Sequence, residues 1–287
     1  MIRLMRRKLF FFVLSTLVIL PGLFYVLMGG LKLGIDFTGG SLLEYKFERE
    51  TKIDEFKKYG TVNQTASNTF IIRTKYQESE NLNQLKNELK NNVGDFEVVR
   101  EENIGPIIGN ELKRKALIGV AVACLMIILY ISYAFRKVPK PASSFRFGVS
   151  AVVALIHDVL VLVGIFAILG KHFNIEIDSL FVTALLTVIG FSVHDTIVVF
   201  DRIRENMPKY LGLKFSDVAD ISIVQTLARS LNTSLTVVFV LLALLLFGGE
   251  TIRWFVVALL VGVISGTYSS IFNATALLSW WEERLGY

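Results

Sequence analysis

Residues 188–206 read VIGFSVHDTIVVFDRIREN, and this stretch decides how the chain is interpreted. It begins with the apolar pattern of a membrane-spanning helix, then places His194 and Asp195 inside that helix, and ends in a cluster of charged residues. A carboxylate well inside a membrane-spanning helix costs about 3 kcal/mol even on the lenient insertion scale. A proton or ion relay is therefore the first hypothesis, and a structural ion pair is the alternative.

The composition indicates a membrane protein. The chain has 287 residues, of which 53% are hydrophobic, and its mean hydropathy is +0.55. A helix needs about 20 mostly apolar residues to cross the hydrocarbon core, and six runs approach or reach this length: 9–28, 116–135, 147–169, 180–200, 231–247 and 254–278. The first run is too long for the core of a signal peptide. We predict an α-helical polytopic membrane protein with six transmembrane helices, the first of them retained as an anchor.

The positions of Lys and Arg predict the orientation in the membrane. The polar region 29–115 is neutral, with 14 basic and 14 acidic residues. Excess Lys and Arg lie before the first run and in the loops after the second and fourth runs, whereas the opposite short loops hold only Lys171 and Arg253. Because Lys and Arg favour the cytoplasmic side, we expect both termini to be cytoplasmic and residues 29–115 to lie on the outer side. The excess of Lys and Arg is therefore explained by membrane orientation, and we predict no nucleic-acid partner.

The apolar runs and the polar region between the first two divide the chain into three regions. They are residues 1–28 with the first helix, an outer domain at 29–115, and a five-helix bundle at 116–287 with a cytoplasmic loop at 201–228. The outer domain alternates predicted strands at 41–48, 68–75 and 96–101 with predicted helices at 52–59 and 78–92, which suggests a small α/β sheet with helices on one face. In the loop, NMP at 206–208 predicts the end of the fourth helix. Residues 215–227 predict a short amphipathic helix that lies on the membrane surface.

Glycines cluster where the outer domain meets the membrane helices. Gly34, Gly39 and Gly40 precede the first predicted strand, and Gly105 and Gly109 follow the last. Glycine adopts backbone angles that other residues avoid. These positions therefore form either ordinary turns or a hinge on which the outer domain moves.

Asp195 is the leading candidate for a functional residue. Burial and a nearby cation shift the pKa of a carboxyl group in opposite directions, and their balance can place an Asp where it takes up and releases protons. The fifth run opens with Arg229, which lies in a stripe of polar residues at helical spacing: Thr226, Arg229, Ser230, Thr233 and Thr236.

An Asp195–Arg229 pair could act as a proton switch, in which Arg229 holds the charged carboxylate and releases the protonated one. The alternative is an arginine that snorkels to the interface. Five further residues are candidates to support a relay, either inside the spans or beside the pair: Asp158, Ser192, Thr196, Asn232 and Thr233. Asp158 can equally lock helix packing together with His157.

The last run carries Gly262 and Gly266, four residues apart, which predicts close helix packing within the bundle or with a partner. No residues have the spacing of metal ligands, and we find no nucleotide-binding signature. We therefore expect no catalytic residue, no metal and no enzymatic activity.

Several motifs together resemble the SecF family of protein-export membrane subunits. GIDFTGG at 34–40 resembles the family's motif after the first span, and IGPIIGNEL at 104–112 resembles its motif before the second. HDVL at 157–160, DTIVVFDRIREN at 195–206, RSLNTS at 229–234 and SGTYSS at 265–270 follow in the family's order. The resemblance covers nearly the whole chain. His194 departs from it, because the family usually has Asn there, and this leaves the pH dependence open.

The resemblance implies a ferredoxin-like outer domain, membership of the resistance-nodulation-division superfamily and a place in the bacterial plasma membrane. It implies that the proton is the coupling ion, without another cofactor, and that Asp195 and Arg229 are the proton-conducting pair. Members of the superfamily have twelve spans in two halves, so a separate SecD chain is implied. The other implied partners are the SecYEG channel, YajC, the unfolded preprotein and the lipid bilayer.

Two other functions stay open at this point. One is half of a proton-driven exporter for small molecules or lipids, although the outer domain looks too small to form an exit duct alone. The other is a scaffold that stabilises the export channel without conducting protons.

Overall fold

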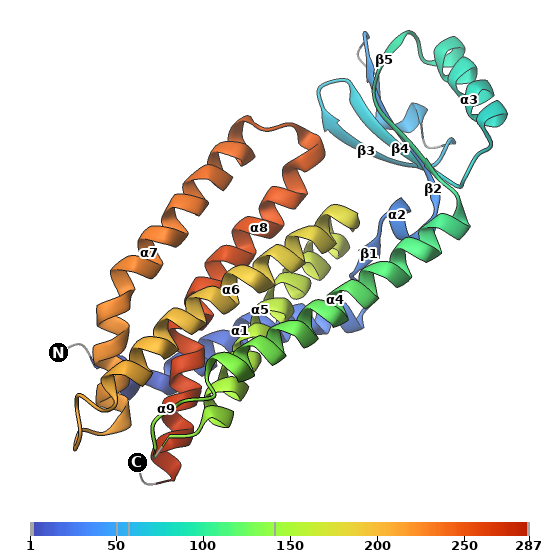
Figure 1. Ribbon diagram of the computed structural model, residues 1–287. Helices are drawn as coiled ribbons and strands as arrows, with labels where there is room; N and C mark the ends of the chain where they lie inside the picture. Colours follow the sequence, from blue (N-terminus) through green and yellow to red (C-terminus); the bar gives the residue numbers. More distant parts are fainter. Residues whose placement is uncertain (1–2, 50, 57, 141, 286–287) are drawn as a thin grey trace. The chain divides into compact units, whose positions relative to one another are not determined.

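The computed structural model describes residues 3–49, 51–56, 58–140 and 142–285. The chain divides into two compact units, one of Met1–Lys32 with Gly119–Tyr287 and one of Leu33–Ile118. We call them the helical unit and the sheet unit (Figure 1). The divisions lie close to the predicted domain boundaries after residues 28 and 115.

The helical unit contains the predicted membrane spans. Among the described residues, six helices are long and apolar enough to cross a membrane, and each contains one predicted run to within one residue. They are α1 (Lys8–Leu27, after the 3₁₀ turn η1, Met5–Arg7), α4 (Pro106–Ala134, which begins in the sheet unit), α5 (Ser144–Phe173), α6 (Ser179–Asn206), α7 (Phe215–Phe247), and α8 (Glu250–Tyr268) continued by the π-helical η3 (Ser269–Ala274) and α9 (Thr275–Arg284). The six-helix prediction is confirmed.

One prediction for the loop at 201–228 is confirmed and one is wrong. Helix α6 ends at Asn206 as expected. The separate amphipathic helix at 215–227 does not exist, because these residues are the first turns of α7. No Gly or Pro interrupts residues 215–247, and small polar side chains four residues apart bury one face of α7 along its first half: Ser222, Thr226, Ser230 and Ser234.

Glycines set the contact between α1 and α5. A Cβ atom on Gly164 would lie 2.8 Å from the Cα of Gly22, and one on Gly22 would lie 2.6 Å from the Cα of Gly164. The two backbones therefore touch, which is the way in which small residues bring helices together in lipid. On the other side of the bundle, Gly262 of α8 packs against the side chain of Val188 of α6. The close packing predicted for the last run lies within the bundle.

We expect Gly164→Ala to destabilise the isolated chain, because the added methyl group meets a backbone that cannot rotate away. Overpacking of this kind costs about 1–3 kcal/mol. The matched control is Gly190→Ala in α6, where an added Cβ would meet no atom within 4 Å. Thermal unfolding in detergent measures both variants, and equal midpoints would contradict the assignment of this contact.

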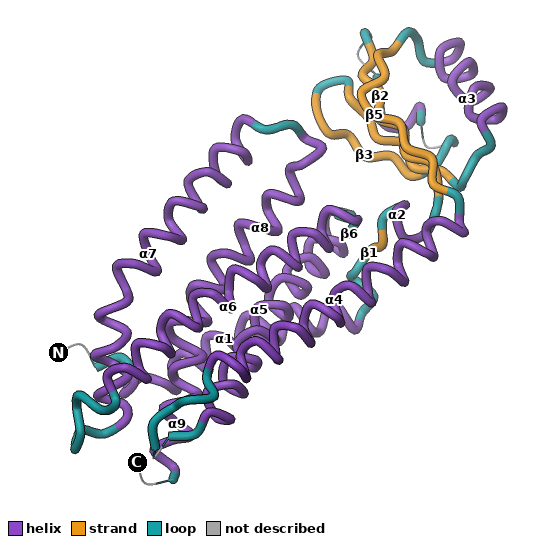
Figure 2. The backbone as a smooth tube through the Cα atoms, viewed as in Figure 1, coloured by secondary structure: helices purple, strands orange, loops and turns teal. Residues whose placement is uncertain are grey.

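The sheet unit is a four-stranded antiparallel sheet with one covering helix (Figure 2). Its elements are β2 (Gly40–Phe47), the 3₁₀ turn η2 (Ile53–Glu55), β3 (Thr61–Ala66), β4 (Thr69–Thr74), α3 (Ser79–Asn92) and β5 (Phe96–Ile104). The strand order β3-β4-β2-β5 is that of the ferredoxin-like fold. Three short elements complete the chain: β1 (Lys32–Leu33), α2 (Ile35–Thr38) and β6 (Glu176–Ile177).

The sheet unit differs from its sequence-based prediction in two elements. The predicted strands at 41–48, 68–75 and 96–101 are present, but β3 was not predicted. Residues 61–66 read TVNQTA, whose single large apolar residue gives no alternating pattern, because β3 is an edge strand. The predicted helix at 52–59 is only the short turn η2, so the first helix of the fold is almost absent.

Candidate proton-relay site

Helix α6 carries Asp195 into the interior of the helical unit. The residue is only 2% exposed, although its neighbour His194 exposes 60% of its side chain. One carboxylate oxygen lies 3.7 Å from His194 Nδ1. Helix α7 brings the Ser234 hydroxyl to the carboxyl group and Arg229 to longer electrostatic range. Among the described residues, Asp195 Oδ2 has no hydrogen-bond partner. This oxygen is therefore available to a proton.

Arg229 lies on the exposed side of α7, away from the buried serine face. The predicted polar stripe thus divides in two, because Thr226 and Ser230 are buried while Arg229 and Thr233 are exposed. The Thr233 hydroxyl donates to the Arg229 carbonyl oxygen at 2.8 Å, and Asn232 is exposed beside it. Arg229 forms no ion pair with any residue that the structure describes, so its charge is left for a group outside this chain or for Asp195 after a helix movement.

A second exposed line was missed by the sequence reasoning. On α6, small and polar residues at helical spacing face outward: Thr183, Thr187, Gly190 and His194. Their spacing of three and four residues is visible in the sequence, but sequence alone does not show that this face of α6 is exposed. The Thr183 and Thr187 hydroxyls donate to carbonyl oxygens of their own helix, so His194 is the side chain of this line that is costly in hydrocarbon. A covering protein surface would remove that cost.

Asp158 is the best-connected buried carboxylate of the helical unit. It lies in α5, is completely buried, and accepts hydrogen bonds from hydroxyl groups of α6, α8 and η3. Ser192 and Ser269 donate to Oδ2 at 2.5 and 2.6 Å, and Ser265 donates to Oδ1 at 2.9 Å. His157 Nδ1 lies 3.0 Å from Oδ1. Asp158 thus joins three membrane-spanning segments.

Ser192 and Thr196, predicted as support for Asp195, are engaged elsewhere. Ser192 donates to Asp158, and the Thr196 hydroxyl lies 2.8 Å from the Ser270 hydroxyl. Ser270 also donates to the Ser192 carbonyl oxygen at 2.9 Å. The π-helical segment η3 carries Ser269, which donates to Asp158, and directly after it Ser270. π-helical turns recur at functional sites. Asp195 and Asp158 therefore occupy different surroundings among the described residues, although α6 and α8 contribute to both.

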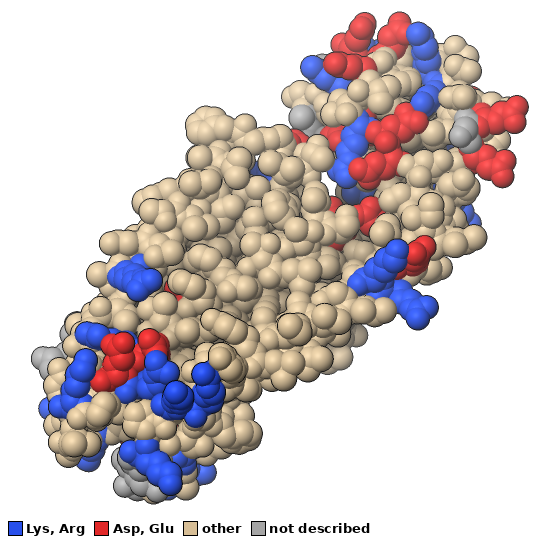
Figure 3. Space-filling model, viewed as in Figure 1, with Lys and Arg blue, Asp and Glu red and all other residues tan. Residues whose placement is uncertain are grey.

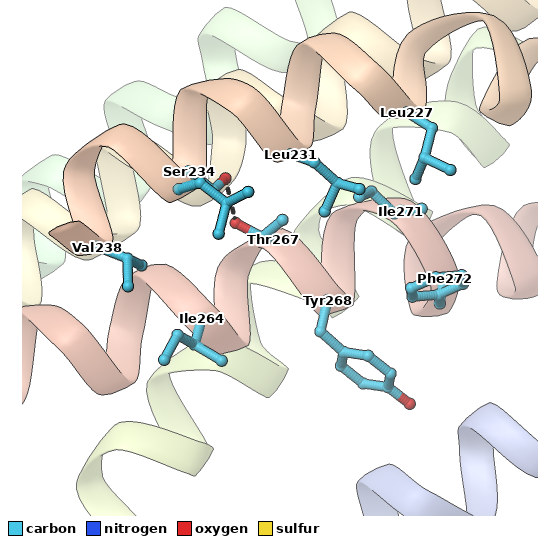
Figure 4. Close-up of a pocket in the computed structure, with 10 residues that line it drawn as sticks. Leu227, Leu231, Ser234, Val238, Ile264, Thr267, Tyr268, Ile271 and Phe272 are labelled. Carbon is cyan, nitrogen blue, oxygen red and sulfur yellow. Dashed lines mark hydrogen bonds between the residues drawn. The ribbon is translucent and has the colours of Figure 1, made fainter.

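Helices α7 and α8 enclose an apolar groove of about 520 Å³ beside Ser234. Figure 4 shows Ser234 and Thr267 pointing toward one another from the two helices, and their hydroxyl oxygens lie 2.6 Å apart. This contact holds Ser234 where it faces Asp195. The groove itself is lined mainly by aliphatic side chains and gives no polar site of its own.

The predicted hinge glycines lie within the sheet unit, and packing or backbone angle constrains three of them. Gly39 has φ +73° and Gly40 has φ +143°, where side chains are disfavoured. A Cβ atom on Gly109 would lie 2.7 Å from the Gly39 nitrogen. Gly34 is extended, and a Cβ on Gly105 would meet only the Tyr76 ring at 3.9 Å. Close packing and left-handed backbone explain three of the five glycines, and a hinge stays a prediction.

Charged side chains gather at one end of the helical unit. Figure 3 shows Lys and Arg concentrated at the end where both chain termini lie, beside a long surface with few charged side chains. Among the described residues, no group of three His, Cys, Asp or Glu could hold a metal ion. The titratable groups inside the bundle are the remaining candidates for chemistry.

Two family models match the chain. Residues 84–284 match the model for the C-terminal region of the protein export membrane proteins SecD and SecF, and residues 26–50 match the model for the SecD/SecF GG motif. The chain belongs to the SecD/SecF family. The second match covers Gly34, Gly39 and Gly40 of the predicted hinge glycines.

The names of similar proteins agree with this family assignment. Protein translocase subunit SecF of Thermobaculum terrenum is 48% identical, over 99% of this chain and 95% of the relative. SecF of Anaerolinea thermophila is 44% identical over the same shares. The crystal structure of SecDF, a translocon-associated membrane protein from Thermus thermophilus, has a TM-score of 0.87 at 31% identity. A super-membrane-facing form of SecDF has a TM-score of 0.73. In both cases the match covers 99% of this chain and 39% of the SecDF chain.

Proposed function

We propose that the chain is the SecF half of a proton-driven accessory unit of the Sec protein-export machinery. The observation that carries this proposal is Asp195, a buried carboxyl group with an unpaired oxygen inside a membrane helix. It takes up a proton from one side of the membrane and releases it to the other. The membrane potential supplies about 2.3 kcal/mol per charge per 100 mV, so a few protons can drive a domain movement.

The proposed partner in this unit is SecD. The solved SecDF chains are longer than this chain, which covers 39% of them. The exposed line of Thr183, Thr187, Gly190 and His194 on α6 contains small residues on which another helix can pack closely. The exposed Arg229 on α7 would be costly in hydrocarbon without a covering surface. A second six-helix half provides that surface, and an acidic group on it would compensate the charge of Arg229.

Gly190→Leu is expected to weaken assembly with SecD several-fold while leaving the chain folded. An added Cβ at this position meets no described atom within 4 Å, so the larger side chain can point outward and would collide with a partner that packs on the exposed line of α6. The matched control is Gly119→Leu in α4, where an added Cβ likewise meets no described atom within 4 Å. Copurification of tagged SecD measures assembly, and unchanged recovery for Gly190→Leu would place the partner on another face.

The proposed location is the bacterial plasma membrane, with both termini in the cytoplasm and the sheet unit outside. The Lys and Arg side chains at the end that holds the termini support this orientation. The SecYEG channel, YajC and the unfolded preprotein are proposed as further partners. Protons are the only coupling ion in this proposal, which includes no enzymatic activity.

A crosslinking experiment tests export against the exporter alternative. A photo-reactive residue at Val98, which is half exposed on β5, is carried by the otherwise native chain during translocation of a preprotein. The proposal expects an adduct with the preprotein, and slower secretion when the chain is deleted. Normal secretion, together with new sensitivity to small toxic molecules, would instead support an exporter.

A further inference from the structure

The hydrogen bonds of Asp158 describe an ionised carboxylate. A carboxylate offers about four acceptor positions, and here three serine hydroxyls and His157 Nδ1 reach the two oxygens. The single hydroxyl hydrogen of Ser269 has the Gly266 carbonyl oxygen as a second acceptor at 3.2 Å, which is longer than its 2.6 Å contact with Asp158. A group that accepts at every position has no place for a proton of its own without giving up one of these bonds. Asp158 in this arrangement differs from Asp195, whose Oδ2 has no partner among the described residues.

The negative charge of Asp158 needs compensation, because it is completely buried. Removing an ionised carboxylate from water without a counter-charge costs several kcal/mol. Among the described residues, the only ion-pair partner of Asp158 is His157. Since Nδ1 faces the carboxylate, it carries a hydrogen in both charge states of the ring. The charge of the dyad therefore depends on whether His157 Nε2 also carries one.

His157 Nε2 is buried and has no hydrogen-bond partner among the described residues. The side chain is 10% exposed, and it lines a cleft of about 340 Å³ between α1, α5 and α8. The other polar residues of this cleft are Ser15, Ser265 and Tyr268. An unpartnered ring nitrogen in a residue that borders a cleft is a place where a proton can bind.

Polar groups continue from this cleft along α1 toward the end of the helical unit that holds the termini. The Tyr268 hydroxyl donates to the Phe11 carbonyl oxygen at 3.0 Å and lies 3.5 Å from the Ser15 hydroxyl. Asn273 Nδ2 donates to Ser15 at 2.6 Å, and its Oδ1 is unpartnered among the described residues. These groups offer hydrogen-bonding positions between His157 and the basic end of the unit.

We propose that His157 and Asp158 form a second proton-binding site of the helical unit, in which a proton binds His157 Nε2 from the cleft and Asp158 is the fixed counter-ion. The site goes beyond the proposed function, which assigns the coupling proton to Asp195. A change in the charge of this site would change the strength of the serine hydrogen bonds that join α5 to α6, α8 and η3.

The groups that face this ring are few. Tyr268 of α8 is the titratable side chain across the cleft, with ring centroids 6.2 Å apart. Helix α1 contributes the uncharged Leu14, Ser15 and Val18. Helix α6 contributes Ser192 to the dyad, while its Asp195 is engaged with His194, Ser234 and Arg229. Helix α9 meets α5 through the Arg146–Glu282 pair at the basic end.

Nitrogen NMR of the full chain in lipid nanodiscs tests this site. The chain has three histidines, so His172→Gln with His194→Gln leaves His157 as the only imidazole. We expect its ring to change between the charged and the Nδ1-protonated neutral form as pH is varied. In Asp158→Asn the titration midpoint should fall by about one pH unit or more, which is a tenfold weaker proton affinity.

A second variant keeps the test informative if Asp158→Asn does not fold. Ser265→Ala removes one donor to Asp158 Oδ1, which strengthens the attraction between the carboxylate and a charged ring and should raise the midpoint. A ring that keeps one charge state from pH 5 to 9 would overturn the proposal, and so would a midpoint that neither variant moves. Either result makes the dyad a fixed packing element and leaves the proposal for Asp195 intact.

Discussion

Replacing Asp195 by Asn is expected to lower proton-motive-force-dependent translocation about tenfold or more, since the potential alone can supply about 2.3 kcal/mol per charge per 100 mV. An amide has the size of the carboxyl group but binds no proton at neutral pH. Because Asp195 Oδ2 has no hydrogen-bond partner among the described residues, the change breaks few contacts. Assembly with SecD should therefore survive. Preprotein translocation into vesicles, with and without a proton gradient, measures the effect.

The matched control for this variant is Asp201→Asn, on the same helix. Asp201 pairs with Arg204 near the end of α6 and exposes 43% of its side chain, so its loss should leave translocation unchanged. Asp195→Glu restores a titratable group and should recover part of the activity. If Asp195→Asn translocates like the native chain, the relay at this residue is wrong. If it assembles but does not translocate, a scaffold role is excluded.

Arg146→Met is expected to destabilise the helical unit by about 3–5 kcal/mol, the cost of leaving a buried charge without its partner. Arg146 Nε lies 2.9 Å from Glu282 Oε1, and the two side chains are 12% and 0% exposed. The pair joins the start of α5 to the end of α9. Methionine keeps the length of the side chain but leaves Glu282 without its cation.

Arg253→Met is the matched control for this pair. Arg253 and Glu250 lie at the opposite end of the last span and expose 49% and 45% of their side chains. An exposed pair of this kind contributes about 0–1 kcal/mol. Unfolding of each variant in detergent, followed by tryptophan fluorescence, measures the difference. Equal losses of stability would show that burial of the Arg146–Glu282 pair has little effect.

The membrane helices could be predicted because a run of about 20 apolar residues has few other stable structures. The end of α6 before Pro208 could be predicted in the same way, from the proline. The continuity of α7 could not be predicted, because the sequence changes from amphipathic to apolar at about residue 228 while the helical backbone continues through this point. Edge strand β3 was missed because its one valine gives no periodic signal.

The candidate site could be predicted only in part. A carboxyl group inside an apolar run identifies Asp195, since its cost is local to the sequence. The serine cluster around Asp158 could not be predicted, because its donors come from α6, α8 and η3 and meet only after the helices pack. The exposure of Arg229 depends on how α7 is rotated about its axis, and that rotation is set by tertiary contacts.

Proton flux is the most direct test of the central claim that Asp195 conducts protons. Vesicles that contain this chain with its SecD, and an internal pH-sensitive dye, are given a proton gradient while a preprotein engages the channel. The account predicts flux with the native chain and loss of that flux with Asp195→Asn at equal amounts of assembled complex. Equal flux in the two preparations would contradict it.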